Sequence, residues 1–506
     1  MSDLPVIVIG SGFGGLGAAV RLRAMGHTVK ILEAGPQAGG RARVFKREGF
    51  TFDAGPTVIT APYLLEELYE ALGERLEDHL ELMPVDPFYR VRFDDGTVFD
   101  YVGDEERILE QIAKISPEDV EGYKRLAEQS SKIFEIGYSQ LADAPFDTVS
   151  EMLRVVPAMV RLKSYKTVYG MVSDYIKDER LRQAFTFQPL LVGGSPFRTS
   201  SIYLLIHWLE RKWGVHFARG GTASIVSGLS DLLARHDVPI ELNSAVSRIV
   251  VENGVAVAVE TEDGRRHDCS MVVSNADPSV VYTKLIDKEH RKRHTDRSVS
   301  RRTQSMSLFV MYFGTNKVYE ELKHHTIVLG PRYKGLLHDI FKKRTLSKDC
   351  SLYLHAPCRS DPSLAPPGHD SFYVLSPVPN QLSDIDWKEE APRYMDMIID
   401  RLEETVMPNL REHLGPHFSV DPRYFEGELR SQDGAAFGIE PTLKQSAYFR
   451  YHNRSEDVDG LYFVGASTHP GAGMPGVLCS AKVLERVVPR PEVPVPVRQK
   501  VTRLAQ

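Results

Sequence analysis

Cysteine is scarce in this sequence and forms no pattern that implies a special role. Four cysteines occur among 506 residues, far apart and never as a CxxC pair: Cys269, Cys350, Cys358 and Cys479. No group of cysteines and histidines has the spacing of a zinc motif. These absences exclude a small disulfide scaffold, predict reduced thiols in a cytosolic protein, and give no reason to expect a bound metal.

Long hydrophobic runs are also absent. No stretch approaches the roughly 18 apolar residues that a membrane-spanning helix needs. The N-terminus has a four-residue apolar run, Val6 to Ile9, without the basic region and long apolar stretch of a signal peptide. We therefore expect a cytosolic protein whose contact with a membrane, where one exists, is peripheral.

Neither sign of charge dominates. The chain has 62 Lys and Arg against 68 Asp and Glu, a net charge of −6, so a dedicated nucleic-acid binder is not expected. A basic stretch at 287–302 is interpreted as a solvated helix or loop. The hydrophobic fraction of 42% is ordinary for a globular protein and excludes disorder, and the length suggests about three domain-sized units.

The first 35 residues have the pattern of a dinucleotide-binding βαβ unit. A buried strand at Val6–Ile9 runs into Gly10-x-Gly12-x-x-Gly15, a helix follows to Met25, and a second strand ends at Glu33. Gly10 permits the tight turn, Gly12 lets the backbone approach a pyrophosphate, and Gly15 lets the helix pack on the strand. Glu33 is positioned to accept hydrogen bonds from ribose hydroxyls.

A second glycine motif separates FAD from NAD. Gly39-Gly40-Arg41 follows Glu33 too early to begin another nucleotide helix, and it resembles the second fingerprint of FAD enzymes in the amine-oxidase superfamily. That resemblance implies that Gly40 admits the cofactor backbone and Arg41 reaches its phosphate or the sheet beneath the flavin. The loop at 51–57, which contains Gly55, resembles the loop beside the isoalloxazine ring.

Near the C-terminus, a strand at 461–464 leads through a glycine-rich loop into a helix. A helix N-terminus favours an anionic acceptor, and the natural one is the N1/C2 carbonyl edge of a reduced flavin. The predicted contacts in this loop are Gly465, Gly473, Met474 and Gly476. His469, without companion ligands nearby, is interpreted as a packing or loop-shaping residue.

Taken together, these motifs resemble the bacterial phytoene desaturase family, the FAD-dependent carotenoid desaturases of the amine-oxidase superfamily. The resemblance extends from Val6 to about Val483 and rests on residues 50–60, 190–194, 199–203, 217–222, 274–277, 353–358 and 465–476. Many amine oxidases carry an acid after the first glycine of the C-terminal loop, where this chain has Ala466. A carboxylate contact to the cofactor from that position is therefore not assumed.

The resemblance implies an activity. The substrate would be 15-cis-phytoene and the product all-trans lycopene, formed by successive hydride transfers to the flavin, with a quinone or oxygen as final electron acceptor. Such chemistry needs a long apolar tunnel and little acid–base machinery. Glu151 and Arg154, which interrupt an apolar stretch, are the candidate catalytic helpers.

Two alternatives remain open. A related carotenoid oxidoreductase, such as a C30 desaturase, a ketolase or an isomerase, would share the cofactor motifs. A non-redox escort of isoprenoid lipids would share the fold but would not need Glu33, Gly40-Arg41 or the loop at 471–476. A colourless protein that ignores added FAD would support the escort.

The expected architecture is an α/β fold. Residues 1–85, 218–285 and 440–488 would form a discontinuous Rossmann-like FAD-binding domain, with Val246 contacting the adenine through its backbone. Residues 86–217 would form a helical substrate and membrane-contact region, residues 286–439 a mixed α+β substrate domain, and residues 489–506 a disordered tail. A homo-oligomer is left open.

An apolar substrate must be drawn from a lipid bilayer. The best candidate for peripheral contact is 152–173, which carries four cations and no acid among many apolar residues: Arg154, Arg161, Lys163 and Lys166. We expect Pro157 to split this stretch into two short helices. Its apolar side chains would enter an anionic membrane surface, with the cations beside them.

Overall fold

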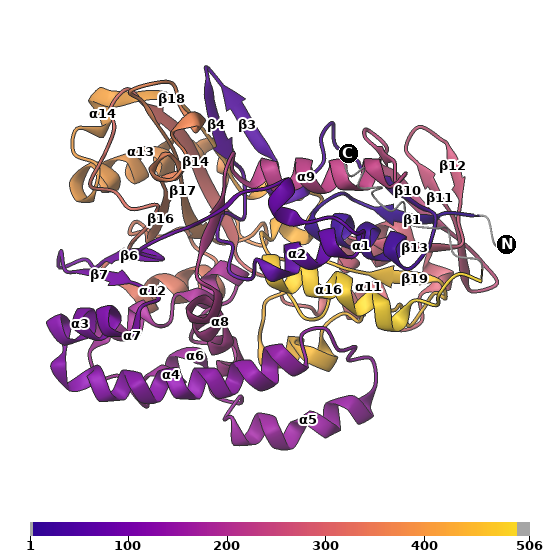
Figure 1. Ribbon diagram of the computed structural model, residues 1–506, viewed down its shortest axis with the longest axis horizontal. Helices are drawn as coiled ribbons and strands as arrows, with labels where there is room; N and C mark the ends of the chain where they lie inside the picture. Colours follow the sequence, from indigo (N-terminus) through magenta and orange to yellow (C-terminus); the bar gives the residue numbers. More distant parts are fainter. Residues whose placement is uncertain (1–3, 493–506) are drawn as a thin grey trace, which may run out of the picture.

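A computed structural model describes residues 4–492 of the chain. Figure 1 shows a parallel sheet towards one end of the long axis and a larger sheet towards the other, with a layer of helices along one side. The parallel sheet has five strands in the order β19 (Leu461–Phe463), β13 (Met271–Ser274), β1 (Val6–Ile9), β2 (Val29–Leu32) and β9 (Ile240–Glu241).

The centre of the parallel sheet is β1, which pairs with β13 on one side and β2 on the other. All four of its residues are buried, as expected of a strand covered on both faces. The sequence correctly predicts β1, β2 and β19 to within one residue. The strand β13 pairs with β1 and not with the antiparallel strands that precede it in the chain, β10 (Val246–Glu252), β11 (Val255–Thr261) and β12 (Arg266–Asp268), a choice decided by tertiary packing.

Three helices cover the parallel sheet: α1 (Phe13–Ala24), α9 (Thr222–Arg235) and α16 (Met474–Val487). The first of these ends as the sequence predicts, with Met25 as C-cap and Gly26 at φ +98°. Leucine and valine side chains from all three helices belong to one buried core with β1.

The second sheet has seven strands and is antiparallel except between β15 and β6. Its order is β18 (Leu414–Val420), β14 (Ser307–Thr315), β17 (Asp370–Val378), β16 (Leu352–His355), β15 (His325–Val328), β6 (Tyr89–Arg92) and β7 (Val98–Tyr101). The strands β6 and β7 lie within the region predicted to be helical. Two short antiparallel pairs complete the strands: β3 (Val44–Arg47) with β4 (Phe50–Asp53), and β5 (Leu82–Pro84) with β8 (His216–Ala218).

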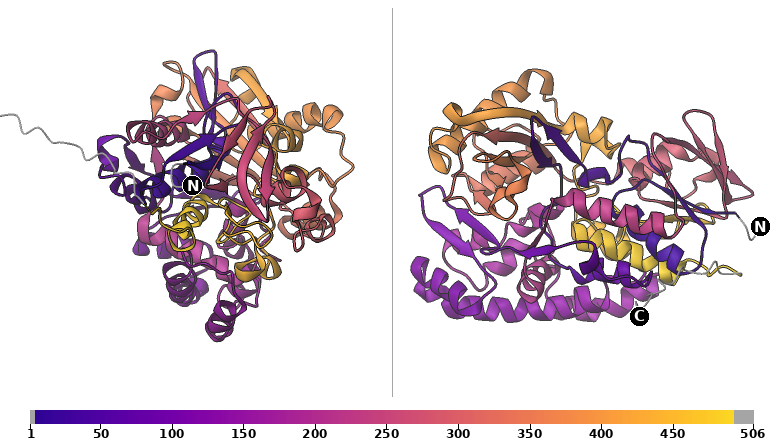
Figure 2. Two further views of the ribbon diagram at one scale, coloured as in Figure 1. Left: turned by 90° about the vertical axis from the view of Figure 1, so that its right-hand side faces the viewer. Right: turned by 45° about the horizontal axis from the view of Figure 1, so that its top comes forward.

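Helices form a layer along one side of the molecule in both views of Figure 2. They are α3 (Glu105–Ile115), α4 (Val120–Phe134), α5 (Val149–Arg161), α6 (Val168–Val172), α7 (Glu179–Ala184) and α8 (Leu205–Trp213). The remaining helices are α2 (Tyr63–Glu70), α10 (Pro278–Val280), α11 (Asp296–Ser300), α12 (Tyr333–His338), α13 (Trp387–Thr405), α14 (Leu410–His413) and α15 (Pro422–Gly427).

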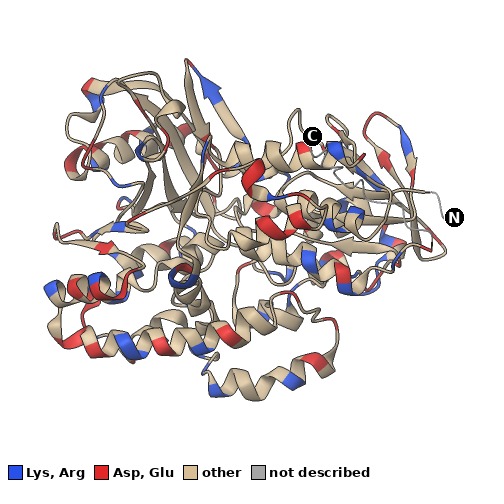
Figure 3. Cartoon of the chain, in the orientation of Figure 1, with Lys and Arg blue, Asp and Glu red and all other residues tan. Residues whose placement is uncertain are grey.

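At the outer edge of this layer lies α5, which has no fully buried residue. The prediction that Pro157 splits the helix is wrong: α5 continues through Pro157, and the break comes after Leu162, where Lys163 adopts φ +56° and Thr167 caps α6. Figure 3 shows α5 as the lowest helix, mostly uncharged, with basic residues along it and an acid only near its start.

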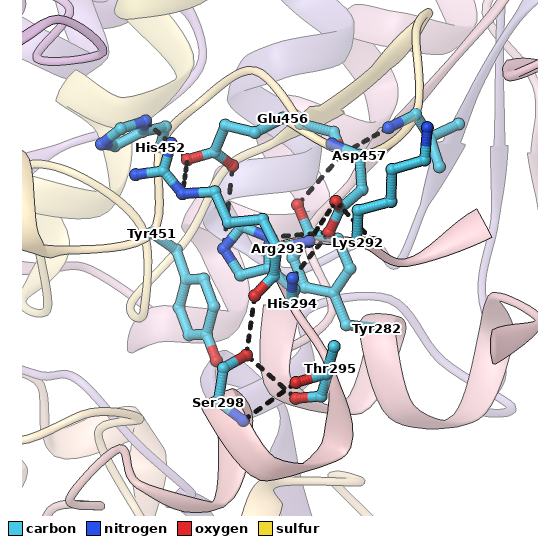
Figure 4. A network of polar contacts seen from close by, with 12 residues as sticks. Tyr282, Lys292, Arg293, His294, Thr295, Ser298, Tyr451, His452, Glu456 and Asp457 are labelled. Atoms are coloured by element: carbon cyan, nitrogen blue, oxygen red, sulfur yellow. Dashed lines mark hydrogen bonds and ion pairs between the residues drawn. The ribbon is translucent and has the colours of Figure 1, made fainter. Parts of the chain in front are cut away.

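The basic stretch at 287–302, interpreted from the sequence as a solvated helix or loop, packs against the C-terminal part of the chain. Figure 4 shows its anchor, the Asp457 carboxylate, which accepts hydrogen bonds from the backbone N–H groups of Lys292, Arg293 and His294. The His294 ring stacks on Tyr282 at 4.2 Å between centroids.

Within residues 4–492, no helix is long and apolar enough to cross a membrane. Of the predicted disordered tail at 489–506, residues 493–506 lie outside the described part of the chain.

Candidate functional site

One large cavity of about 1040 Å³ lies between the glycine-rich loops of the parallel sheet and the apolar side chains of the second sheet and the helical layer. Ligand pockets of single small molecules reach about 1000 Å³, so the cavity has room for a large ligand or for two ligands side by side. All the predicted cofactor-binding residues line it except Gly15: Gly10, Gly12, Glu33, Gly40, Arg41, Gly55, Val246, Gly465, Gly473, Met474 and Gly476.

The turn between β1 and α1 leaves bare backbone at the cavity wall. A Cβ on Gly12 would lie 2.8 Å from Asn275 Nδ2, and one on Gly15 would lie 1.9 Å from the Gly10 carbonyl oxygen. Gly15 therefore packs the helix on the strand and does not face the cavity. Asn275 closes this turn from the end of β13, a role that the sequence analysis missed although 274–277 belongs to the resemblance motifs.

Glu33 braces the same turn. Its Oε2 accepts hydrogen bonds from the Ser11 N–H at 2.8 Å and the Ser11 hydroxyl at 2.6 Å, and its Oε1 accepts one from the Gly35 N–H at 2.8 Å. A carboxylate has about four acceptor positions, so capacity remains for a hydroxyl in the cavity. The sequence predicts only the ligand contact, since the partner Ser11 lies 22 residues away.

The Gly39-Gly40-Arg41 turn faces Gly12 across the cavity floor. Gly40 has φ +55°, and a Cβ there would lie 3.4 Å from the Gly12 Cα, so both backbones must stay bare to leave a channel between them. The Arg41 guanidinium lines the channel, donates to Ser431 Oγ at 2.8 Å, and has a buried Nε without a hydrogen-bond partner. Burial lowers the pKa of Arg41, and Asp277 opposes this. A half-buried cation with an unpaired Nε beside bare backbone fits a phosphate group.

A second helix N-terminus meets the cavity from the other side. Gly473 caps α16 at φ +91°, and Gly473, Met474 and Gly476 line the wall. The Gly476 Cβ position lies 2.6 Å from the Gly471 carbonyl oxygen, so the loop can turn only with glycine there. The N–H groups at such a helix start favour electron-rich oxygen or nitrogen atoms.

Arg450 holds this C-terminal loop in place. Its fully buried guanidinium donates to the carbonyl oxygens of Thr468 at 3.1 Å and Ala466 at 2.5 Å. His469 is also buried, and burial lowers its pKa to about 4; its Nε2 lies 3.2 Å from the Leu141 carbonyl oxygen. These contacts fit the predicted loop-shaping role of His469, whereas no sequence motif pointed to Arg450.

Much of the rest of the cavity wall is apolar and comes from elements far apart in the sequence. Met152, Val155 and Met159 project from one face of α5, and further apolar side chains come from the segment at 187–192, α8 and β14. Because the polar floor and the apolar walls enclose one cavity, a nucleotide-type ligand and an apolar ligand can meet in it.

One buried acid interrupts the apolar wall. Glu210 on α8 is 0% exposed, accepts a hydrogen bond from the Tyr89 hydroxyl at 2.7 Å through Oε1, and leaves Oε2 without a partner. Burial raises the pKa of Glu210 to about 8, and the hydrogen bond from Tyr89 opposes part of that rise. No sequence pattern pointed to Glu210, since it is one acid on an amphipathic helix.

The geometry does not favour the predicted catalytic part of Glu151 and Arg154. Neither side chain lines the cavity, and Arg154 is exposed. Glu151 forms a capping box with Thr148: the Thr148 N–H donates to its carboxylate at 3.1 Å, and the Glu151 N–H donates to the Thr148 hydroxyl. The Thr-x-x-Glu spacing that signals this cap is visible in the sequence.

Comparison with known proteins places these features in a family. The profile of the family "Flavin containing amine oxidoreductase" matches residues 13–482. Phytoene desaturase (lycopene-forming) from Pseudescherichia vulneris is 48% identical over 477 residues, covering 94% of this chain and 97% of its own. The enzyme of the same name from Pantoea ananas is 47% identical, covering 94% of this chain and 97% of its own.

Solved structures agree at the level of the fold. Cyclohexylamine oxidase from Brevibacterium oxydans has a TM-score of 0.61 at 18% identity, covering 96% of this chain and 98% of that one. An oxidoreductase from Methanosarcina mazei has a TM-score of 0.64 at 17% identity, covering 96% and 100%. The predicted fold class and the resemblance read from the motifs are confirmed.

Gly12→Val tests the glycine floor. The new side chain would meet Asn275 and enter the channel towards Gly40, so we expect a folded protein without flavin, measured as visible flavin absorbance per chain. Gly427→Val, at the end of α15 where a Cβ meets open space, is the control and should keep its flavin. A Gly12→Val protein with a full complement of flavin would contradict the assignment.

Proposed function

The chain belongs to the family of flavin-containing amine oxidoreductases, and from this premise we propose that it desaturates 15-cis-phytoene to all-trans lycopene with FAD as cofactor. The observation that carries the proposal is the single cavity with a glycine-rich, phosphate-compatible floor and apolar walls. The relatives support the product: identity is 46–48% to lycopene-forming enzymes and 32% to a C30 enzyme, the 4,4'-diapophytoene desaturase of Methylomonas sp.

The residues of the floor would hold the cofactor by distinct contacts. The N-terminus of α1 and Arg41 would take the pyrophosphate, Glu33 the ribose hydroxyls, and the Val246 backbone the adenine. The loop at 465–476 and the start of α16 would face the flavin end, next to Gly55. When bound, FAD supplies a hydride acceptor for the allylic C–H bond.

The FAD-binding domain would comprise 1–85, 218–285 and 440–488. The supporting observation is that these three segments supply all five strands of the parallel sheet: β1 and β2 from the first, β9 and β13 from the second, and β19 from the third. The second sheet and the helical layer would then form the substrate side.

The apolar walls would position the polyene and exclude water. A hydrocarbon offers no polar handle, so alignment depends on the shape of a wall made by residues such as Met159, Phe187 and Leu209. The electrons would pass to a quinone or to oxygen. A non-redox escort is not favoured, because it has no use for Arg41 or the α16 loop.

Glu210 is our candidate for the group that takes the proton left after hydride removal. It is the buried carboxyl in the apolar wall, and its free Oε2 can accept a proton. Tyr89 holds Oε1 and thereby orients the carboxyl. Burial raises the pKa of Glu210 to about 8, so the group acts as a base in its carboxylate form and becomes neutral when it takes the proton.

The decisive assay is conversion of phytoene. Purified protein, FAD and phytoene-loaded liposomes are expected to yield lycopene on chromatography, with no product when FAD is omitted from flavin-stripped protein. Conversion of a C30 precursor in preference to phytoene would favour the related oxidoreductase. A protein that binds phytoene without product and stays colourless with FAD would support the escort.

Glu210→Gln should lower the initial rate by about 100-fold or more while leaving flavin bound, since general bases contribute about that much. For wild type, the rate should rise with pH through about 8, because only the deprotonated carboxylate accepts a proton. Tyr89→Phe removes a bond that lowers this pKa, so its profile should shift to higher pH. An unchanged profile in Glu210→Gln would exclude the role.

We further propose that α5 docks on an anionic membrane surface. Its inward face, with Met152, Val155 and Met159, lines the cavity, while Leu153 and Val160 on the other face are 64% and 58% exposed. A helix that is apolar on both faces joins an apolar cavity to an apolar medium. Arg154, Arg161 and Lys163 are exposed beside it, whereas Lys166 is paired with Asp174 at 2.5 Å. Each free cation near anionic lipid contributes about 1 kcal/mol.

Leu153→Glu with Val160→Glu should release the protein from anionic liposomes in a flotation assay, with flavin content unchanged. Leu382→Glu is the matched control, because Leu382 is 46% exposed in the loop before α13. Charge reversal at Arg161 and Lys163 should also weaken binding, most strongly at low salt, because salt screens the repulsion between the new acids and anionic lipid. A double variant that floats like wild type would place the docking face elsewhere.

A further inference from the structure

Three buried histidines meet behind the wall of the cavity. His325 begins β15 and His355 ends β16, and the two residues are register partners in the antiparallel ladder. His324 immediately precedes β15. One ring nitrogen of each histidine lies within 4.8 Å of those of the other two, and none of the three residues is more than 5% exposed.

The outer nitrogens of two of these rings are held by hydroxyl groups. His324 Nδ1 lies 2.7 Å from Ser360 Oγ, and His325 Nδ1 lies 2.7 Å from the Tyr353 hydroxyl. The Nε2 atoms of both histidines are buried and have no hydrogen-bond partner. An imidazole with one nitrogen oriented by an oxygen atom and the other free is the usual arrangement of a metal-ligating histidine.

The third ring faces a carboxylate. His355 Nε2 lies 3.7 Å from Asp53 Oδ2, and His355 Nδ1 has no partner. Asp53 is itself buried at the end of β4; its Oδ1 accepts a hydrogen bond from the Thr222 N–H at 2.8 Å, whereas Oδ2 accepts none. Thus each histidine has an oxygen atom on its outer side.

A hydrogen bond network alone does not satisfy this cluster. Leaving several buried polar atoms without partners is rare in native proteins. A single water molecule in the middle could donate to two nitrogens and accept from the N–H of the third ring, so water is the occupant that the zinc test must exclude. A divalent metal ion accepts lone pairs from all three nitrogens at once. Tetrahedral zinc with Zn–N bonds of about 2.0–2.1 Å places its ligand nitrogens about 3.4 Å apart. The three nitrogens, which lie within 4.8 Å of one another, would therefore have to close by up to about 1.4 Å when the ion binds.

We propose that His324, His325 and His355 bind a divalent transition-metal ion of the zinc type, with Asp53 as the outer partner of His355. Imidazole ligands suit zinc and its first-row neighbours. The site has a structural role: it ties β15 and β16 to the end of β4. It lies one side-chain layer behind the cavity, because the Tyr353 hydroxyl that holds His325 is also 3.3 Å from Thr57 Oγ1, and both Tyr353 and Thr57 line the cavity.

The test is zinc binding by the flavin-loaded protein. Protein stripped with a chelator and then dialysed against zinc should retain about one zinc per chain by elemental mass spectrometry, and its Tm should rise with added zinc. His324→Gln and His355→Gln should each weaken zinc binding by at least about 100-fold, since even outer-partner changes cost about 10–100-fold. Asp53→Asn should weaken binding less.

His207→Gln is the matched control. His207 is also a buried histidine, hydrogen-bonded to Tyr101 on the far side of β6, and its variant should bind zinc as wild type does. Flavin absorbance reports that each variant is folded. Wild-type protein that retains less than about a tenth of a zinc per chain, with a Tm indifferent to zinc, would overturn the proposal, as would a His324→Gln, His355→Gln double variant with unchanged affinity. None of these readouts depends on the substrate of the enzyme.

Discussion

The packing of α1 against α16 is the contact on which the rest of the site depends. The two helices can approach because small residues face each other: a Cβ on Gly17 would lie 3.4 Å from the Ala481 Cβ. This approach brings the N-termini of both helices to one cavity, although the helices begin some 460 residues apart in the sequence. Two helix N-termini give the cavity a floor of free N–H groups and partial positive charge. The bare backbone of Gly12 and Gly40 keeps that floor open.

Buried polar side chains then hold the loops that follow these helices and strands. Glu33 accepts three hydrogen bonds that close the first turn, and Arg450 donates to two carbonyl groups of the last loop. A buried polar group left unpaired costs about 1–3 kcal/mol, so each of these contacts favours one loop conformation over its competitors. The Asp457 network of Figure 4 extends the same principle to 292–294, which it ties to the segment that carries Arg450.

The apolar side of the cavity is built by side-chain packing and not by hydrogen bonds. Its walls offer few hydrogen-bonding groups, so a ligand there is positioned by the shape of the wall and by the exclusion of water. Glu210 is an exception, a buried carboxyl among apolar side chains. The helix α5 belongs to both the wall and the surface, since one of its faces lines the cavity and the other is exposed. Its capping box fixes where the helix starts, which sets the register of both faces.

The sequence by itself determined the βαβ unit, the glycine turns and the family, because each depends on local spacing: glycine is required where a turn or a close approach allows no side chain, and the motif spans few residues. It also predicted the strands β1, β2 and β19, through their short apolar runs. Only the tertiary structure decided that β13 pairs with β1, that β6 and β7 join the second sheet, and that Glu151 caps a helix away from the cavity. The same holds for Glu210, Arg450 and the three histidines, whose significance lies in burial and in partners from distant segments. Burial and long-range pairing arise when separate elements pack together, and a spacing rule along one chain does not encode them.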